Sequence, residues 1–230
     1  MKQSNSLRYI VEQADQLYAL RSDLRNVEAS VDLLQSVETS FEVAWRLARA
    51  RFFLGQECTR GASSISHHRA GIGAGRSAVR QRIERVEGFF WLGVNLALAA
   101  QQELPLKAVV HAIQAKRALD KAIQIDAAYH AAGPLRVMGR LQHKLPRIFG
   151  GGLQRALGNY EKAIALAPAN TVTRIFLAEL LLEMGDANRT RIELAAVLEA
   201  PTDSEWMFEI ERDKNLARRT IETFVSGSND

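Results

Sequence analysis

The chain repeats one phrase, which reads ALDKAIQIDA at residues 118–127 and NYEKAIALAP at residues 159–168. In each copy a bulky residue, Leu119 or Tyr160, is followed by Ala three positions later and preceded by Ala four positions earlier. Residues at these spacings lie on one face of a helix. The small residues let a second helix approach closely, and the bulky residue fills the space beside it. The phrase therefore predicts a chain built from repeated helix pairs, in which each pair covers the apolar face of the next.

The spacing of small and bulky residues matches the second helix of a tetratricopeptide unit, whose period is about 34 residues. Steps of that period locate five helix pairs along the chain. Their interior positions, unit by unit, are Val11, Ala14, Tyr18, Val27, Val31 and Leu34; Trp45, Ala48, Phe52, Gly71, Gly75 and Ala78; Phe89, Leu92, Gly93, Leu96, Ala115, Leu119 and Ala122; Leu135, Met138, Gly139, Ala156, Tyr160 and Ala163; and Leu177, Ala178, Leu194 and Val197. We therefore expect an all-α fold, a right-handed tetratricopeptide-like helical solenoid that forms a single domain over residues 1–230.

Several local signals predict where helices begin and where turns lie. Thr39 and Glu42 have the spacing of a capping box, so we expect a helix to start near residue 40. Thr202 and Glu205 have the same spacing and open a C-terminal helix near 204–224, which would cap the apolar end of the solenoid. The last residues, from Ser226 on, are expected to fray. Where the repeat is longer than its consensus we expect extended turns, near residues 56–67, 101–110 and 146–153.

Composition narrows the class of protein. With 47% apolar and 24% charged residues, the 230-residue chain is expected to fold around a full core. Its 30 Lys and Arg against 26 Asp and Glu leave a net charge of only +4, and its single cysteine, Cys58, excludes an intrachain disulfide. The most apolar stretch, 89–100, is well short of the ~20 residues of a membrane span. The polar N-terminus carries no export signal, so the sequence as written predicts a cytoplasmic protein without a membrane span.

Catalytic and cofactor motifs find little support. The five histidines and Cys58 have none of the paired spacings of a metal site, and we expect His67 and His68 to flank a solvent-facing loop. No G-x-S-x-G motif occurs, and the glycine-rich run at 71–75 has neither a strand before it nor a Lys-Ser/Thr after it. The sequence therefore predicts no enzyme activity, no cofactor and no metal.

A basic stretch from Arg60 to Arg85 is the one candidate for nucleic-acid binding. It contains Arg69, Arg76, Arg80 and Arg82 and scarcely any acidic residue. It has no aromatic residue on which bases could stack, and its arginines spread around the helix axis. We therefore predict a basic helix on the convex side and no nucleic-acid partner.

The concave face of such a solenoid is lined by the first helix of each pair, and its inward positions are the candidate binding site. The candidate members in the second and third units are apolar: Phe53, Phe90 and Val94. Those in the fourth unit are basic: Arg136, Arg140, His143 and Lys144. The fifth unit contributes Glu179 between the apolar Ile175 and Leu182. An apolar floor with cations at one end suits a small amphipathic or anionic ligand or an acidic protein partner. Arg136 and Arg140 lie one turn apart and could instead pair internally with Glu179, which leaves a structural scaffold without a small-molecule ligand as the alternative.

Four segments together resemble one known family. They are VEGFFWLG at residues 86–93, YHAAGPLRVMGR at 129–140, KLPRIFGG at 144–151, and the stretch from Tyr160 to Glu179. This combination resembles the T-component family of TRAP transporters over roughly residues 40 to 200. The resemblance implies an oligomeric periplasmic lipoprotein with a ligand-accessible channel or cavity and a substrate-binding protein as partner. It also implies a periplasmic location if a leader is missing from the sequence as written.

Overall fold

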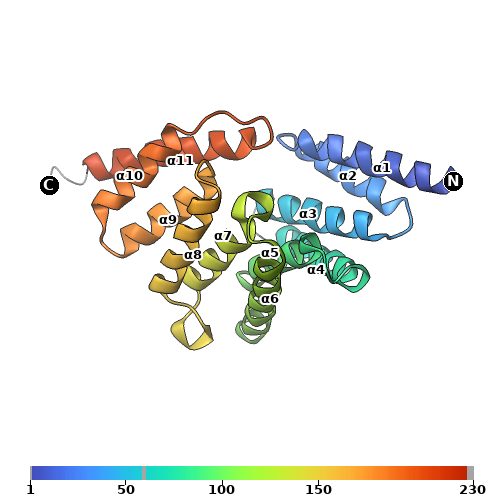
Figure 1. The fold of residues 1–230 in the computed structure, drawn as a ribbon, viewed down its shortest axis with the longest axis horizontal. Coiled ribbons are helices and arrows are strands. Elements are labelled where there is room, and N and C mark those ends of the chain that lie inside the picture. The colour runs from blue at the N-terminus through green and yellow to red at the C-terminus, as the bar shows by residue number, and fades with distance from the viewer. Residues whose placement is uncertain (1, 59–60, 227–230) are drawn as a thin grey trace. The chain divides into compact units, whose positions relative to one another are not determined.

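A computed structural model describes residues 2–58 and 61–226, and the described residues form eleven α-helices and no strand (Figure 1). The chain divides into two compact units, residues 1–126 and 127–230. The helices of unit 1 are α1 (Lys2–Ala19), α2 (Leu24–Gln35), α3 (Phe41–Glu57), α4 (Ala62–Gln81), α5 (Val86–Ala100) and α6 (Pro105–Asp126). Those of unit 2 are α7 (Tyr129–Lys144), the 3₁₀ helix η1 (Arg147–Phe149), α8 (Leu153–Leu166), α9 (Thr171–Glu183), α10 (Ala187–Leu198) and α11 (Met207–Ser226). That all 230 residues form one domain stays a prediction.

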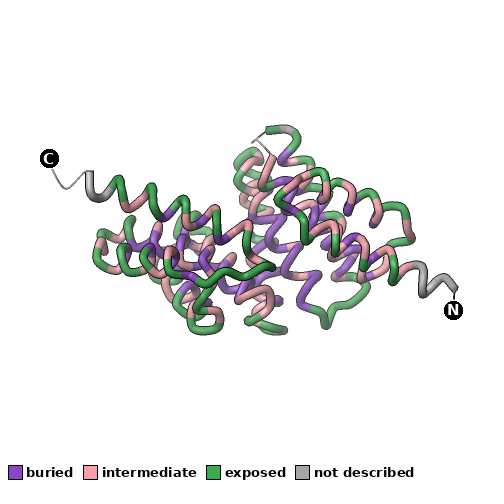
Figure 2. The backbone as a smooth tube through the Cα atoms, turned by 90° about the horizontal axis from the view of Figure 1, so that it is seen from above, coloured by how far each residue is buried: buried purple, intermediate pink, exposed green. Residues whose placement is uncertain are grey.

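Helix packing within each unit follows the tetratricopeptide pattern, as predicted. Each first helix packs on its second helix, and first helices of successive pairs also touch: α1 with α3, α3 with α5, α7 with α9, and α9 with α11. The buried positions of each unit lie between these helices (Figure 2). The fold is an all-α, tetratricopeptide-like helical solenoid, and α11 packs on α9 and α10 as the expected capping helix.

The repeated phrase packs in the same way in both units. A Cβ atom at Gly93 would lie 2.8 Å from Cγ of Leu119, and one at Gly139 would lie 2.7 Å from Cδ1 of Tyr160. The bulky residue of each phrase therefore packs directly on a glycine of the preceding helix. Gly75 is similarly close to α5, with its added Cβ 2.9 Å from the Cα of Leu92.

Two of the three expected extended turns are wrong, because the extra residues lengthen helices instead. α4 begins at Ala62 and runs for 20 residues, and α6 begins at Pro105 and runs for 22. Proline suits the first turn of a helix, where its missing N–H has no partner to lose. The third turn is confirmed: η1 is followed by Gly150 and Gly152, both at positive φ.

The longer α4 also corrects the expectation for the adjacent histidines. His68 is buried, and its Nδ1 lies 3.4 Å from Oδ1 of Asn95. The Nδ2 amide of Asn95 donates to the Ala48 and Trp91 carbonyls. The ring fits only because residue 55 is a glycine, whose added Cβ would meet it at 2.5 Å. Burial lowers the pKa of His68, so the ring is neutral near pH 7. His68 is therefore part of the core of unit 1.

Both predicted capping boxes differ in detail from the structure. α3 starts at Phe41, close to the expected place, but the cap is Ser40, whose hydroxyl accepts from the Val43 N–H. The last helix starts at Met207, and the Asp203 carboxylate accepts the N–H of Glu205 before it. In both places the residue that follows the predicted threonine, Ser40 or Asp203, supplies the acceptor instead. The expected frayed tail at 227–230 lies outside the described residues.

Candidate functional site

The first helices of unit 2 face each other across a row of polar pairs. Arg136 Nη1 donates to Oδ1 of Asn170 at 3.3 Å, Arg140 pairs with Glu179, and His143 Nε2 lies 2.9 Å from Oε2 of Glu183. We call this row the α7–α9 ladder; its members are Arg136, Arg140, His143, Asn170, Glu179 and Glu183. The structure thus brings together four residues predicted for the site, and Lys144 follows them as an exposed residue at the end of α7.

The Arg136 end of the ladder is buried and serves the backbone. Its guanidinium donates to the carbonyls of Ala131 at 2.8 Å and His130 at 3.4 Å. These carbonyls belong to a left-handed turn, in which His130, Ala131 and Ala132 have φ values of 52°, 52° and 57°. Such a conformation costs an L-residue about 1–2 kcal/mol, so a buried cation that fixes three consecutive residues there has a structural role.

Burial lowers the pKa of Arg136 to about 10, opposed by the nearby carboxylates of Asp213 and Glu209. The side chain therefore remains a cation at neutral pH. Asp213 is itself buried, accepts a hydrogen bond of 2.7 Å from the Thr171 hydroxyl, and has its pKa raised by burial. Asp213 pairs with Arg212 at 3.3 Å, and because Arg136 and Asp213 are both buried, neither is presented to a ligand.

The middle of the ladder reaches solvent. The side chains of Arg140 and Glu179 are 27% and 40% exposed, and the Arg140 guanidinium also stacks 4.4 Å from the ring centroid of Phe176. The Tyr160 hydroxyl lies buried near this pair without a hydrogen bond of good geometry, and burial raises its pKa. An ion pair with a solvent-accessible carboxylate can change partners, because water can hydrate the carboxylate that leaves.

The far end of the ladder combines a buried ring with an exposed carboxylate. The His143 side chain is buried while Glu183 is half exposed. Burial lowers the pKa of His143, and the hydrogen bond to Glu183 opposes that shift. Nδ1 of His143 makes no hydrogen bond within the described residues. Glu183 was missed from the sequence, although it lies 40 residues beyond His143, much as Glu179 lies 39 beyond Arg140.

The apolar residues predicted for the site lie elsewhere. Phe53, Phe90 and Val94 are buried in unit 1, where Phe53 packs edge-on against Tyr18 and Phe90 against Trp91. The expected apolar floor of an open groove is packed core in this structure.

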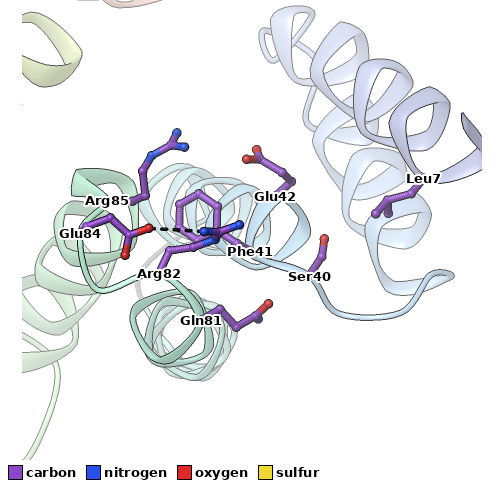
Figure 3. Close-up of a pocket in the computed structure, with 8 residues that line it drawn as sticks. All are labelled: Leu7, Ser40, Phe41, Glu42, Gln81, Arg82, Glu84 and Arg85. Atoms are coloured by element: carbon purple, nitrogen blue, oxygen red, sulfur yellow. Dashed lines mark ion pairs between the residues drawn. The ribbon is translucent and has the colours of Figure 1, made fainter. Parts of the chain in front are cut away.

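Unit 1 has an open hollow of about 640 Å³ that no sequence pattern predicted. Figure 3 shows its lining, which comes from α1, the cap and first residues of α3, the last residue of α4 and the turn between α4 and α5: Leu7, Ser40, Phe41, Glu42, Gln81, Arg82, Glu84 and Arg85. Its charges are largely matched, since Arg82 pairs with Glu84, Arg85 with Glu87 outside the hollow, and Glu42 with Arg46. The hollow therefore presents no surplus of either charge to a ligand.

A second charged group in unit 1 joins α1 to α3. Asp15 accepts from Arg46 at 2.9 Å and from Arg49 at 2.6 Å, and Arg49 also stacks on the rings of Tyr18 and Trp45. The acid and its partners are 31 and 34 residues apart, about one repeat period, which is the signal that could have found them.

The structure also bears on metal binding and on membrane insertion. Within residues 2–58 and 61–226, no three His, Cys, Asp or Glu side chains gather as a metal site would require. In the part of the chain that the structure describes, no helix combines the length and apolar character needed to cross a bilayer.

Comparison with known proteins gives a family and a fold. The family model for the TRAP transporter T-component matches residues 76–220. Among solved structures, the chain is similar to TTC0263, a thermophilic TPR protein of Thermus thermophilus, with a TM-score of 0.67 and 21% identity. That match covers 90% of this chain and 97% of the other, and at this identity it shows the tetratricopeptide (TPR) fold alone. No curated protein matches the sequence.

Proposed function

Because the chain belongs to the TRAP transporter T-component family, we propose that it is a non-catalytic binding protein that serves TRAP-type solute transport. Its partner is a solute-binding protein, or a small amphipathic anion that such a transporter handles. The binding face is the solvent-exposed part of the α7–α9 ladder together with Lys144.

One observation carries this proposal: the Arg140–Glu179 pair is partly exposed, with 27% of the Arg140 side chain and 40% of the Glu179 side chain accessible to solvent. An incoming carboxylate can replace Glu179 on Arg140 in a bidentate geometry and gain a second cation at Lys144. The cost of opening the pair is limited because the Glu179 carboxylate is 40% exposed and can be hydrated once it leaves Arg140. Arg136 supports this face from below by fixing the start of α7.

A structural scaffold without a small-molecule ligand is the second candidate. It is favoured by the internal hydrogen bonds of Arg136 and by the Arg140–Glu179 pair, which already satisfy both cations. In that case the ladder only joins α7 to α9, and any partner binds elsewhere.

Native mass spectrometry of the purified chain, followed by titration with the solute-binding protein of a TRAP system from the same organism, separates the two candidates. We expect a retained small anion or a complex, and its loss in the variant Arg140→Gln/Lys144→Gln. The control is Arg189→Gln, which removes a similarly exposed pair with Glu161 in the same unit. Absence of both ligand and complex in the wild type, or equal binding by the variant, supports the scaffold and contradicts the proposed binding face.

The same family relation leads us to propose a periplasmic location. Osmotic-shock release of the protein with a periplasmic marker, from cells that express the native gene, supports this. Retention with a cytoplasmic marker contradicts it.

A further inference from the structure

α6 carries an apolar stripe on the side that faces away from its own unit. Leu106, Val110 and Ile113 are 80%, 45% and 42% exposed, and Leu104 just before the helix is 74% exposed. The opposite side of α6 is made of small buried residues such as Ala112 and Ala115, which pack on α5. Within the described residues of unit 1, the stripe therefore takes no part in the helix packing of the repeat.

The spacing of the stripe is that of a helix–helix seam. Leu106, Val110, Ile113 and Arg117 follow one another at intervals of four, three and four residues, which is the alternation of a and d positions in a heptad. Over these residues the seam is about 17 Å long. The first three positions are apolar and the fourth is a cation, so a partner helix needs apolar residues followed by a carboxylate.

The surface around the stripe is basic. Arginines of α4 reach this surface: Arg69 pairs with Glu103, just before α6, at 2.7 Å, and Arg76 donates to Gln114 of α6 at 2.9 Å. The half-exposed acid nearest the end of the seam, Asp120, is already paired with Lys116. Four exposed cations on the two helices make no ion pair within the described residues: Arg80, Lys107, Arg117 and Lys121.

We propose that the α6 stripe docks an amphipathic helix of a protein partner that carries carboxylates beside its apolar face. Charge complementarity selects this occupant, because a second copy would bring Arg117 and Lys121 toward like charges. A bilayer fits less well, since Arg117 lies on the same line as Leu106 and Ile113 and would enter the depth of the acyl chains. A nucleic acid offers nothing apolar to cover the three residues of the stripe. This surface lies in unit 1 and does not depend on the function proposed for the α7–α9 ladder.

The test uses the full chain and a fluorescein-labelled helical peptide of about three heptads, with Leu at a and d and Glu at e and g. We expect saturable binding by fluorescence anisotropy that weakens as salt is added. The variants Leu106→Ser/Ile113→Ser and Arg117→Glu/Lys121→Glu should each weaken binding at least ~10-fold. A matched peptide with Lys in place of Glu should not bind.

The control variant is Lys162→Glu/Ile192→Ser, which changes an exposed cation and an exposed apolar residue in unit 2. It should bind the peptide like the wild type, and all variants should melt within ~2 °C of it because the positions are exposed. Absence of peptide binding, or equal binding by the stripe variants, overturns the proposal. Three other results also overturn the proposal: sedimentation of the protein with phosphatidylglycerol vesicles, binding of a DNA duplex, and a dimer seen by light scattering. Each counts if the stripe variants abolish it and the peptide does not compete with it.

Discussion

In both units the first helices of successive repeats pack on each other, and we call each such contact a junction. The junction of α3 with α5 and the junction of α7 with α9 contain different kinds of polar side chain. Between α3 and α5 the polar group is neutral and buried: the Asn95 amide donates to the Ala48 carbonyl at 2.9 Å and to the Trp91 carbonyl at 2.8 Å, and its oxygen faces His68. Between α7 and α9 the groups are charged, and Arg140 and Glu179 reach solvent. The repeat sets the distance between the helices, while the inward side chains decide whether the junction is core or an accessible face.

The largest loss of stability is expected at the buried end of the charged junction. Arg136→Gln removes donors from the left-handed turn at 130–132 and takes a nearby cation away from the buried Asp213. Losing charge-assisted hydrogen bonds to partly buried backbone carbonyls, which are then left without this donor, should cost about 3 kcal/mol. For a chain of this length the melting temperature should fall by roughly 6–12 °C. Thermal unfolding followed by circular dichroism measures this, and a change as small as that of Arg189→Gln would remove the structural role of Arg136.

A smaller loss is expected at the neutral junction. Asn95→Ala leaves the buried Ala48 carbonyl without the donor that crosses from α5, which should cost about 2 kcal/mol. Asn159→Ala is the matched control, because Asn159 only donates to the Gln142 side chain at a partly buried site. Urea unfolding of the two variants should separate them clearly. Equal midpoints would mean that the Asn95 network contributes nothing to the packing of α3 on α5.

The two junctions should also differ in their response to pH. Burial lowers the pKa of His68 and of His143, so each folded ring binds its proton less readily than the unfolded chain does. The stability that results is present above the unfolded pKa of about 6.5 and is lost as the pH falls through the folded value. The shift at His143 is opposed by the Glu183 carboxylate, whereas the hydrogen-bond partners that oppose it at His68, the Asn95 side chain and the Gly55 backbone, carry no charge, so His68 should contribute the larger share. Unfolding across this range should be flatter in His68→Gln than in His143→Gln, and the reverse order would contradict the comparison.

The smallest expected effect is a gain in stability. Gly73 lies on the exposed side of α4, where an added Cβ meets nothing, so Gly73→Ala should stabilise by about 0.5–1 kcal/mol. Gly71, two positions earlier, faces the Asn95 side chain, and Gly71→Ala should destabilise instead. Opposite shifts of the two melting temperatures are the result to look for. Two shifts of the same sign would mean that α4 does not present these faces as described.

Sequence periodicity was sufficient for the helix pairs because small and bulky residues must alternate where helices touch. Gly93, Leu119, Gly139 and Tyr160 were all predicted as interior positions, and the structure shows that Gly93 packs on Leu119 and Gly139 on Tyr160. The lengths of α4 and α6 could not be predicted, because a longer helix and a longer turn give the same distance along the chain between repeats. His68 was misplaced for this reason, and its burial depends on the glycine at residue 55, far from it in sequence.

The candidate site was partly predictable. Arg140 and Glu179 lie slightly more than one repeat apart on corresponding helices, so their meeting followed from the frame. The burial of Arg136 could not be predicted from the repeat pattern. It depends on three non-glycine residues in the left-handed conformation, which local propensity disfavours. Phe53, Phe90 and Val94 lie on the predicted helices, but they are buried and do not line an open groove. The spacing of apolar residues is the same whether a helix contact is packed or open.

The central claim is that the ladder has a structural end and a binding end, and one paired measurement tests it most directly. In Arg140→Gln/Lys144→Gln we predict lost binding of the co-purifying anion or of the solute-binding protein, with a melting temperature within about 3 °C of the wild type. The small shift follows because Glu179, left without Arg140, is 40% exposed and can be hydrated, so its pair contributes at most about 1 kcal/mol. A fall in melting temperature as large as that of Arg136→Gln, with no ligand or partner bound by the wild type, would contradict the claim and make the whole ladder structural.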